Sequence, residues 1–401
     1  MSSLPTHTLA IDGARPVRDE MLDFSPPVIG EEEIESVVAT LRSGWLTVGP
    51  RVAELEQRFA GYVGAPHAIA TASCTDALHL ALLAAGVGPG DEVITSSFTW
   101  PATANAILHT GARPVFADID AGTLNLDPDA FAAAIGDRTR AVVPVHLAGA
   151  ACDMDAIERI AREHGLAIVE DAAHAVETVA GDRKVGAIGD FTCFSLYATK
   201  SLAGGEGGLI TTPSGEAERR LRLLRSQGIT REPWLRRELR TLGHYDVEEP
   251  GYKASLNDLH AAAALPKLDR LEEQWERRAA LTARYDAALA PLRGVEPIGR
   301  PAGGRHSHHL YIVRIDESLA GSGRDRYAEA LLAENISTGL HFLPVHGLTW
   351  FRENLPARPL PVTELAGRQV LSLPLAAAHS TADVDDVIAA LAKVHAVFAG
   401  S

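Results

Sequence analysis

The chain has 401 residues, of which 46% are hydrophobic, and its 37 basic and 52 acidic side chains give a formal net charge of −15. This balance excludes a broad surface for nucleic acid or anionic membranes, because both require clustered positive charge. It leaves room for a small anionic ligand in a locally basic pocket, and the length predicts two or three domains.

The N-terminal segment, residues 1–49, contains one strong helical pattern. Apolar side chains recur at helical spacing from Ile34 to Leu41, and the pattern stops before Gly44. Because glycine commonly follows the last turn of a helix, we predict a helix over 31–42.

The middle of the chain alternates short apolar runs with helical patterns. This alternation is typical of βαβ units and a largely parallel sheet. Several apolar runs are continuous, as expected for strands buried on both faces. Glycines close two helical patterns, at 76–85 and 153–164. We therefore predict one large α/β domain over 50–262, with strands at 67–71, 92–96, 114–118, 141–146, 166–170, 192–196 and 208–212.

The last third of the chain, 263–401, predicts a smaller α/β domain against which the N-terminal segment packs. A glycine- and proline-rich stretch at 294–304 separates its elements. Apolar residues at helical spacing and one strand-like run define those elements. We expect helices over 265–289, 325–334 and 380–398 and a strand over 309–315.

Missing patterns exclude several classes of protein. No apolar run approaches the roughly 18 residues of a membrane span, and the first residues lack a signal-peptide pattern. The three cysteines form no C-x-x-C pair, which fits a reducing compartment. Histidines cluster at 306–309 without a second ligand group at metal-site spacing, so we predict no metal. We expect a cytoplasmic, soluble protein.

Two acids end one predicted buried strand. Glu170 and Asp171 follow Leu166 to Val169, and His174 comes three residues later. Ligands of open α/β sheets bind at this edge of the sheet. A carboxylate here could act as a general base, bind a ribose or pair with a cationic heterocycle. The alternative is that it caps the next helix.

A lysine follows a second predicted strand. Lys200 lies beside hydroxyl residues and precedes the glycine-rich stretch 204–208. Burial at such a position lowers the pKa of a lysine and makes its amine nucleophilic, although a surface loop is the alternative. Lys200 and Asp171 are about one βαβ unit or hairpin apart. Pyridoxal 5'-phosphate (PLP) requires both, a lysine for an imine and an acid for the pyridine nitrogen.

A phosphate-binding site should accompany this pair. Ser73, Cys74 and Thr75 open a predicted helix whose free N–H groups suit an anion, and Ser195 adds a hydroxyl from a neighbouring strand end. Simple N-capping is the alternative. Trp100 follows another strand and could stack on a cofactor or pack in the core.

These segments resemble the DegT-type family of nucleotide-sugar aminotransferases, which are PLP enzymes of fold type I. The resemblance extends over nearly the whole chain and rests on many motifs in order. It implies a large domain with a mostly parallel seven-stranded sheet and a smaller α/β C-terminal domain. The matching segments are 43–50, 88–93, 103–106, 144–147, 170–174, 195–200, 206–208, 251–253, 341–342 and 372–375.

The resemblance also implies roles for single residues. Lys200 would form the imine with PLP, Asp171 would pair with the pyridine nitrogen, and Trp100 would stack on the ring. His174 would lie by the ring face or its phenolic oxygen. The phosphate contacts would come from Ser73, Cys74, Thr75 and Ser195.

Two positions depart from the family pattern. Many members have glycine where this chain has Cys74, a change that keeps the backbone N–H. Many members also have an asparagine that reaches the phosphate from the partner subunit, where this chain has Ser255. We still expect a homodimer with active sites at the interface.

The resemblance favours dTDP-4-keto-6-deoxyhexose as substrate and glutamate as amino donor. The substrate contacts would come from Trp45, Thr47, Lys253, His341 and Phe342. A basic segment that includes Lys253 could bind the diphosphate, or it could be a solvated face; its other members are Arg231, Arg236 and Arg237.

Four alternatives stay open. They are amination of a 3-keto sugar, amination of a cyclitol ketone, a PLP-dependent sugar dehydratase and a non-catalytic regulator of the same fold. The best-known dehydratase relatives have histidine in place of the lysine, and Lys200 is intact. An NAD dehydrogenase is disfavoured because its glycine fingerprint is absent from the first strand-to-helix turn.

Overall fold

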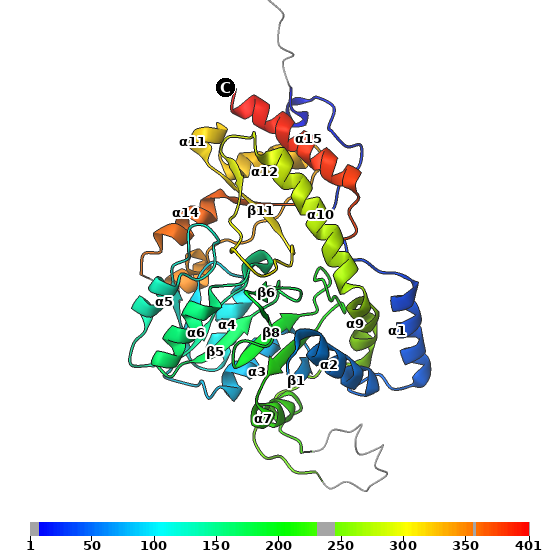
Figure 1. Ribbon diagram of the computed structural model, residues 1–401, viewed down its shortest axis with the longest axis vertical. Helices are drawn as coiled ribbons and strands as arrows, with labels where there is room; N and C mark the ends of the chain where they lie inside the picture. The colour runs from blue at the N-terminus through cyan, green and yellow to red at the C-terminus, as the bar shows by residue number, and fades with distance from the viewer. Residues whose placement is uncertain (1–7, 231–244, 356–357, 401) are drawn as a thin grey trace, which may run out of the picture.

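The computed structural model describes residues 8–230, 245–355 and 358–400 of the chain. Two layered bodies lie one above the other in the view of Figure 1. The larger body surrounds a seven-stranded sheet and the smaller a three-stranded sheet. In the described part of the chain, no helix is long and apolar enough to cross a membrane.

The large sheet has the strand order β1-β9-β8-β5-β4-β2-β3. Only β9 runs against its neighbours, and all other adjacent pairs are parallel. The carboxyl ends of the parallel strands therefore meet at one edge. The strands are β1 (His67–Thr71), β2 (Glu92–Ser96), β3 (Arg113–Ala117), β4 (Thr139–Val143), β5 (Ala167–Asp171), β8 (Phe191–Ser195) and β9 (Gly208–Thr212).

Helices cover both faces of this sheet (Figure 1). Apolar side chains fill the layers between helices and strands, such as Leu55 and Phe59 on one face and Leu78 and Leu80 on the other. Along the chain, β5 and β8 are separated by a short hairpin of β6 (Val179–Ala180) and β7 (Arg183–Lys184). The helices are α2 (Pro50–Val63), α3 (Cys74–Ala84), α4 (Pro101–His109), η2 (Leu147–Gly149), α5 (Pro128–Ala134), α6 (Met154–Glu163), α7 (Gly215–Arg225) and α9 (Asp258–Asp269).

The small domain packs helices against an antiparallel sheet of order β10-β11-β12. Its core includes Tyr285, Tyr311 and Tyr327, and Leu9 and Leu22 of the N-terminal segment join it. The blue N-terminal stretch accordingly runs beside the red α15 in Figure 1. The elements are η1 (Ala10–Asp12), α10 (Leu271–Leu289), β10 (Val295–Pro297), β11 (Tyr311–Ile315), α11 (Glu317–Ala320), α12 (Arg324–Ala333), η3 (Val345–Gly347), α13 (Thr349–Asn354), α14 (Pro361–Gln369), β12 (Val370–Leu373) and α15 (Thr381–Phe398).

The predicted continuous helix over 265–289 is wrong. The chain instead forms α9 and α10, which are separated at Arg270. Leu265 and Leu268 pack in the core of the large domain, whereas Tyr285 packs in that of the small domain. Leu271, the first residue of α10, still packs in the core of the large domain, so α10 itself runs from one core to the other.

The predicted N-terminal helix is present as α1 (Glu31–Ser43) and packs against α9. It does not bury its apolar side chains, since Ile34 is 47% and Leu41 52% exposed. Glu33 is buried instead, where it forms an ion pair with Arg270. An unpartnered apolar face therefore lies along α1.

Candidate active site

The carboxyl ends of β5 and β8 bring Asp171 and Lys200 to one edge of the sheet. Asp171 is the last residue of β5, and Lys200 lies in the turn after β8, where its N–H donates to Tyr197 O at 2.9 Å. Burial lowers the pKa of Lys200 to about 8, against the opposing effects of Cys74 and Asp171. The amine therefore loses its proton more readily than an ordinary lysine, which favours a nucleophilic role.

Asp171 is almost fully enclosed. Burial raises the pKa of its carboxyl group, while hydrogen bonds and the charge of Lys200 oppose this shift. Thr103 Oγ1 donates to Asp171 Oδ2 at 2.8 Å, and Ala173 N–H donates to Oδ1 at 3.2 Å. These donors orient the carboxylate and favour its charged form.

The two acids at the end of β5 point to opposite faces of the sheet, as successive strand residues do. Glu170 accepts hydrogen bonds from His146 Nε2 at 2.8 Å and from Thr192 Oγ1 at 2.7 Å. Burial opposes ionisation of Glu170, yet these hydrogen bonds lower its pKa. Glu170 therefore supports the sheet, and Asp171 is the acid that shares a site with Lys200.

The N-terminus of α3 lies at the same edge. Ser73 caps this helix, because its Oγ accepts from Asp76 N at 3.0 Å and donates to Asp76 Oδ2 at 2.8 Å. N–H groups in the first turn, such as those of Cys74 and Thr75, have no intrahelical acceptor and suit an anion. Burial raises the pKa of Cys74 well above its usual value, with Asp171 adding to the shift, so the thiol stays neutral.

Two hydroxyl groups flank this helix end. Ser195 Oγ accepts from Tyr197 N at 3.2 Å, which leaves its own proton to donate elsewhere. Ser255 lies opposite Thr71 at the end of β1. Its hydroxyl donates to Arg225 O at 3.0 Å within the same chain.

Aromatic rings form one wall near Lys200. The His174 ring stacks on that of Phe342, with the ring centroids 5.9 Å apart. The ring centroids of Phe342 and Trp100 are 6.2 Å apart. Burial, with Lys200 adding, lowers the pKa of His341 to about 4, and the ring nitrogen Nδ1 of His341 lies 2.9 Å from Ser372 Oγ. Burial and Lys200 also lower the pKa of His174 well below its usual value. Both histidines are therefore neutral, and Trp100 is 64% exposed at the rim.

The other predicted substrate residues, Trp45, Thr47 and Lys253, belong to different segments of the chain. Trp45 Nε1 donates to Val48 O at 2.8 Å, and Thr47 O accepts from Asp258 N at the start of α9. Lys253 is exposed and pairs through its backbone with Ser226. The other members of the predicted basic segment, Arg231, Arg236 and Arg237, lie outside the described residues.

Two residues at this site were not singled out from the sequence. Thr103 was part of a matching motif, and its position in the first turn of α4 was the available signal. His309 lies 3.4 Å from Lys200, between the Nε2 and Nζ atoms. The sequence placed His309 at the start of a strand and in a histidine cluster. It gave no signal for a contact with Lys200, because the two residues are 109 positions apart.

Comparisons with known proteins agree with this geometry. A model of the DegT/DnrJ/EryC1/StrS aminotransferase family matches residues 27–392. The chain belongs to this family. The spore coat polysaccharide biosynthesis protein SpsC of Bacillus subtilis (strain 168) is 47% identical over 380 residues, which cover 94% of this chain and 98% of SpsC.

Solved structures of other aminotransferases give the same result. The structure of DesI in the presence of its TDP-sugar product is 36% identical, with a TM-score of 0.88 over 97% of this chain and 96% of DesI. Spr1654 from Streptococcus pneumoniae, in its PLP form, is 32% identical, with a TM-score of 0.87 over 94% of this chain and 98% of Spr1654. The predicted family and fold are confirmed, and the chain is a PLP-dependent sugar aminotransferase.

The residues present suit the cofactor of this aminotransferase. The start of β9 passes so close to α3 that a Cβ added at Gly208 would lie 2.5 Å from Ser73 O. The absence of a side chain at Gly208 therefore allows β9 to lie close to the residue that precedes α3. An amine, a carboxylate and a helix N-terminus at one sheet edge match the imine, pyridine nitrogen and phosphate of PLP.

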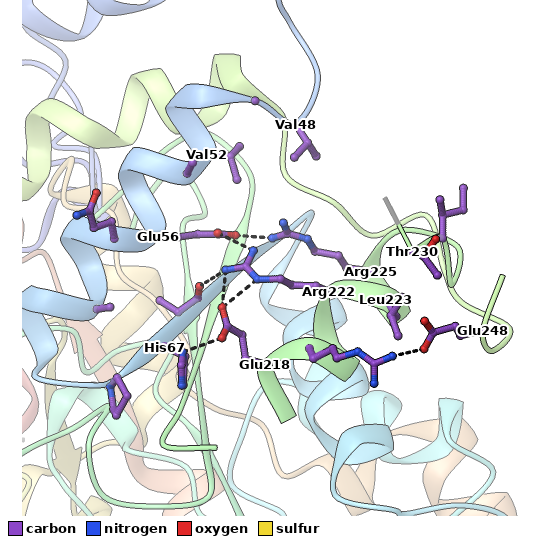
Figure 2. A pocket seen from close by; sticks show the side chains of 18 residues that line it. Val48, Val52, Glu56, His67, Glu218, Arg222, Leu223, Arg225, Thr230 and Glu248 are labelled. Carbon is purple, nitrogen blue, oxygen red and sulfur yellow. Dashed lines mark hydrogen bonds and ion pairs between the residues drawn. The ribbon is translucent and has the colours of Figure 1, made fainter. Parts of the chain in front are cut away.

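A separate cavity of about 600 Å³ lies between α2 and α7 (Figure 2). Figure 2 shows Arg222 between Glu56 and Glu218, at 2.9 Å from each, and Arg225 paired with Glu56. His67, the first residue of β1, contacts Glu218 at 2.8 Å. The cavity is thus at the opposite end of β1 from the α3 N-terminus, and its charged groups neutralise one another.

Proposed function

We propose that this aminotransferase converts a nucleoside-diphosphate-linked 4-keto-6-deoxyhexose, with dTDP as the favoured nucleotide, into the 4-amino sugar. Glutamate is the proposed amino donor. The observation that carries the proposal is the pairing of Lys200 and Asp171 at the sheet edge in a chain similar to DesI, whose structure contains a TDP-sugar product. The similarity to SpsC supports use of the amino sugar in a polysaccharide.

The cofactor and the protein divide the chemistry. Bound PLP withdraws electrons from the carbon that carries the amino group. Lys200 binds the cofactor and, as a free amine, accepts and returns a proton at Nζ. Asp171 holds a proton at the pyridine nitrogen through its carboxylate. The first turn of α3, with Cys74 and Thr75, and the Ser195 hydroxyl bind the phosphate.

The aromatic wall near Lys200 provides apolar and hydrogen-bonding side chains for the sugar. Phe342 offers an apolar face to a 6-deoxy sugar, and the neutral His341 can hydrogen-bond a hydroxyl. Trp100, whose ring lies next to Phe342, would stack on the cofactor ring. Trp45, Thr47 and Lys253 are the proposed contacts for the rest of the substrate. The exposed side chain of Lys253 is suited to a diphosphate because a lysine offers three N–H donors on a flexible stem.

We propose a homodimer with active sites at the subunit interface. The exposed apolar side chains of α1, Ile34 and Leu41, support this because a monomer rarely leaves such a face uncovered. Ser255, whose hydroxyl donates to Arg225 O in its own chain, stands at the position of the family's phosphate-binding asparagine. The free thiols of all three cysteines support a cytoplasmic setting.

The test combines a substrate screen with one substitution. Purified protein is incubated with glutamate and a panel of keto-sugar nucleotides and cyclitol ketones, and the products are identified from their masses by mass spectrometry. We expect amination of the 4-keto-6-deoxy sugar nucleotide. Amination of a 3-keto sugar or of a cyclitol ketone alone would refute the proposed substrate.

The substitution Lys200→Ala tests the catalytic centre. This variant should lose the yellow colour of the PLP-bound protein and all turnover, whereas Lys184→Ala, which removes a lysine stacked on Tyr62, should keep both. Retention of turnover by Lys200→Ala would exclude Lys200 as the reactive amine.

A further inference from the structure

One histidine of the small domain reaches the reactive lysine. The chain turns into β11 just after His309, whose ring is 7% exposed. Its Nε2 atom lies 3.4 Å from Lys200 Nζ, and its ring lies 4.5 Å from that of His174 at 30°. Asp171 and Cys74, whose electrostatic effects oppose the lowering of the Lys200 pKa, belong to the large domain.

The loop that carries His309 is fixed to the large domain. Ser307 N–H donates to Gly149 O and His309 N–H to Ala148 O, both at 3.1 Å. Ser307 Oγ also donates to His174 O at 2.6 Å. The loop approaches so closely that a Cβ at Gly149 would collide with Ser307. The backbone of His309 therefore cannot shift without breaking several contacts.

The surroundings of His309 keep its ring neutral. Burial lowers the pKa of His309 well below its usual value, and Lys200, Arg278, His341 and His306 add to this shift. Arg278 forms an ion pair with Glu177 at 2.6 Å. A neutral imidazole with its proton on Nδ1 has a free lone pair on Nε2, which faces the lysine amine.

We propose that His309 is a positioning residue for Lys200: its Nε2 accepts a hydrogen bond from the amine and holds Nζ in one orientation within the site shared with Asp171 and Cys74. The inference rests on the proposed role of Lys200 as the reactive amine. It gives the small domain a direct part in catalysis, because docking of the 307–310 loop places the acceptor. A lysine side chain has many rotamers, so one fixed acceptor restricts Nζ strongly.

The test compares two amide side chains at this position. His309→Asn is too short to reach the amine, whereas His309→Gln can place an amide oxygen near the position of Nε2. We expect kcat to fall about tenfold in His309→Asn with little change in KM, and to recover in His309→Gln. The matched control is His308→Asn, in the same loop, because His308 stacks near Trp275 and asparagine tolerates its positive φ of 54°.

A second readout uses the protein without cofactor. The reactivity of Lys200 toward acetic anhydride is followed against pH by peptide mass spectrometry. Loss of the acceptor destabilises the protonated amine, so the pKa of Lys200 should fall in His309→Asn and return in His309→Gln. Thermal unfolding establishes that each variant is folded, and His309→Leu replaces His309→Asn if the latter does not fold.

Two outcomes would overturn the inference. Wild-type kcat and wild-type Lys200 reactivity in folded His309→Asn would do so, as would failure of His309→Gln to recover either property. These results differ from failure of the proposed function, in which Lys200→Ala itself keeps its turnover.

Discussion

The hydroxyl group of Thr103 is expected to set the charge of Asp171. Thr103 is 1% exposed, and its Oγ1 donates to Asp171 Oδ2 at 2.8 Å. Thr103→Val replaces this donor with a methyl group of similar size. Burial already raises the pKa of Asp171, so removal of a donor to the carboxylate should raise it further.

The size of the effect follows from the hydrogen bond. A bond to a charged group contributes about 1.5 to 3 kcal/mol, and one pKa unit corresponds to about 1.36 kcal/mol. The pKa of Asp171 should therefore rise by about one to two units. The Ala173 N–H still donates to Oδ1, which places the expected shift nearer the lower value.

The assay is kcat/KM for amination as a function of pH. Activity requires ionised Asp171, so activity is lost as the pH falls through the pKa of this group. The acid limb should move to higher pH in Thr103→Val. Two controls share the site: Thr103→Ser keeps the hydroxyl, and Thr99→Val removes only the 2.8 Å contact between Thr99 and Thr103. An acid limb at the wild-type position in folded, PLP-loaded Thr103→Val would refute the reasoning.

Two further substitutions test the structure around the site. Gly208→Ala should weaken PLP binding by at least tenfold in an absorbance titration, because the added Cβ would meet Ser73 O at 2.5 Å; unchanged affinity would contradict the role given to this close approach. Glu56→Gln should lower the free energy of unfolding in urea by about 3 kcal/mol at pH 7, since it replaces the buried carboxylate that forms an ion pair with Arg225 by a neutral amide. Burial opposes ionisation of Glu56, but Arg225 and Arg222 lower its pKa, so its contribution is present above the unfolded pKa and is lost as the pH falls through the folded value. The difference between wild type and Glu56→Gln should therefore shrink in acid, and a difference independent of pH would contradict this account.

The sequence by itself determined the elements and the chemistry of the site. Strands at 67–71, 92–96 and 208–212 have the predicted bounds, because buried strands carry continuous apolar runs between turn residues. Asp171 and Lys200 were singled out because Asp171 ends such a run and Lys200 lies in the turn that follows another. Their signals are local, and the carboxyl ends of parallel strands must meet at one edge of a sheet.

Only the tertiary structure decided how these groups are tuned. Thr103 reaches Asp171 across 68 positions, and His309 reaches Lys200 from the small domain across 109. The side chains of α10 likewise join two cores, that of the large domain at Leu271 and that of the small domain at Tyr285. Hydrogen-bond partners and burial depend on which surfaces pack together, and no local pattern specifies a contact between distant segments. The sequence therefore pointed to the proposed reactive groups, Lys200 and Asp171, while the packing of the two domains sets their hydrogen-bond partners and burial.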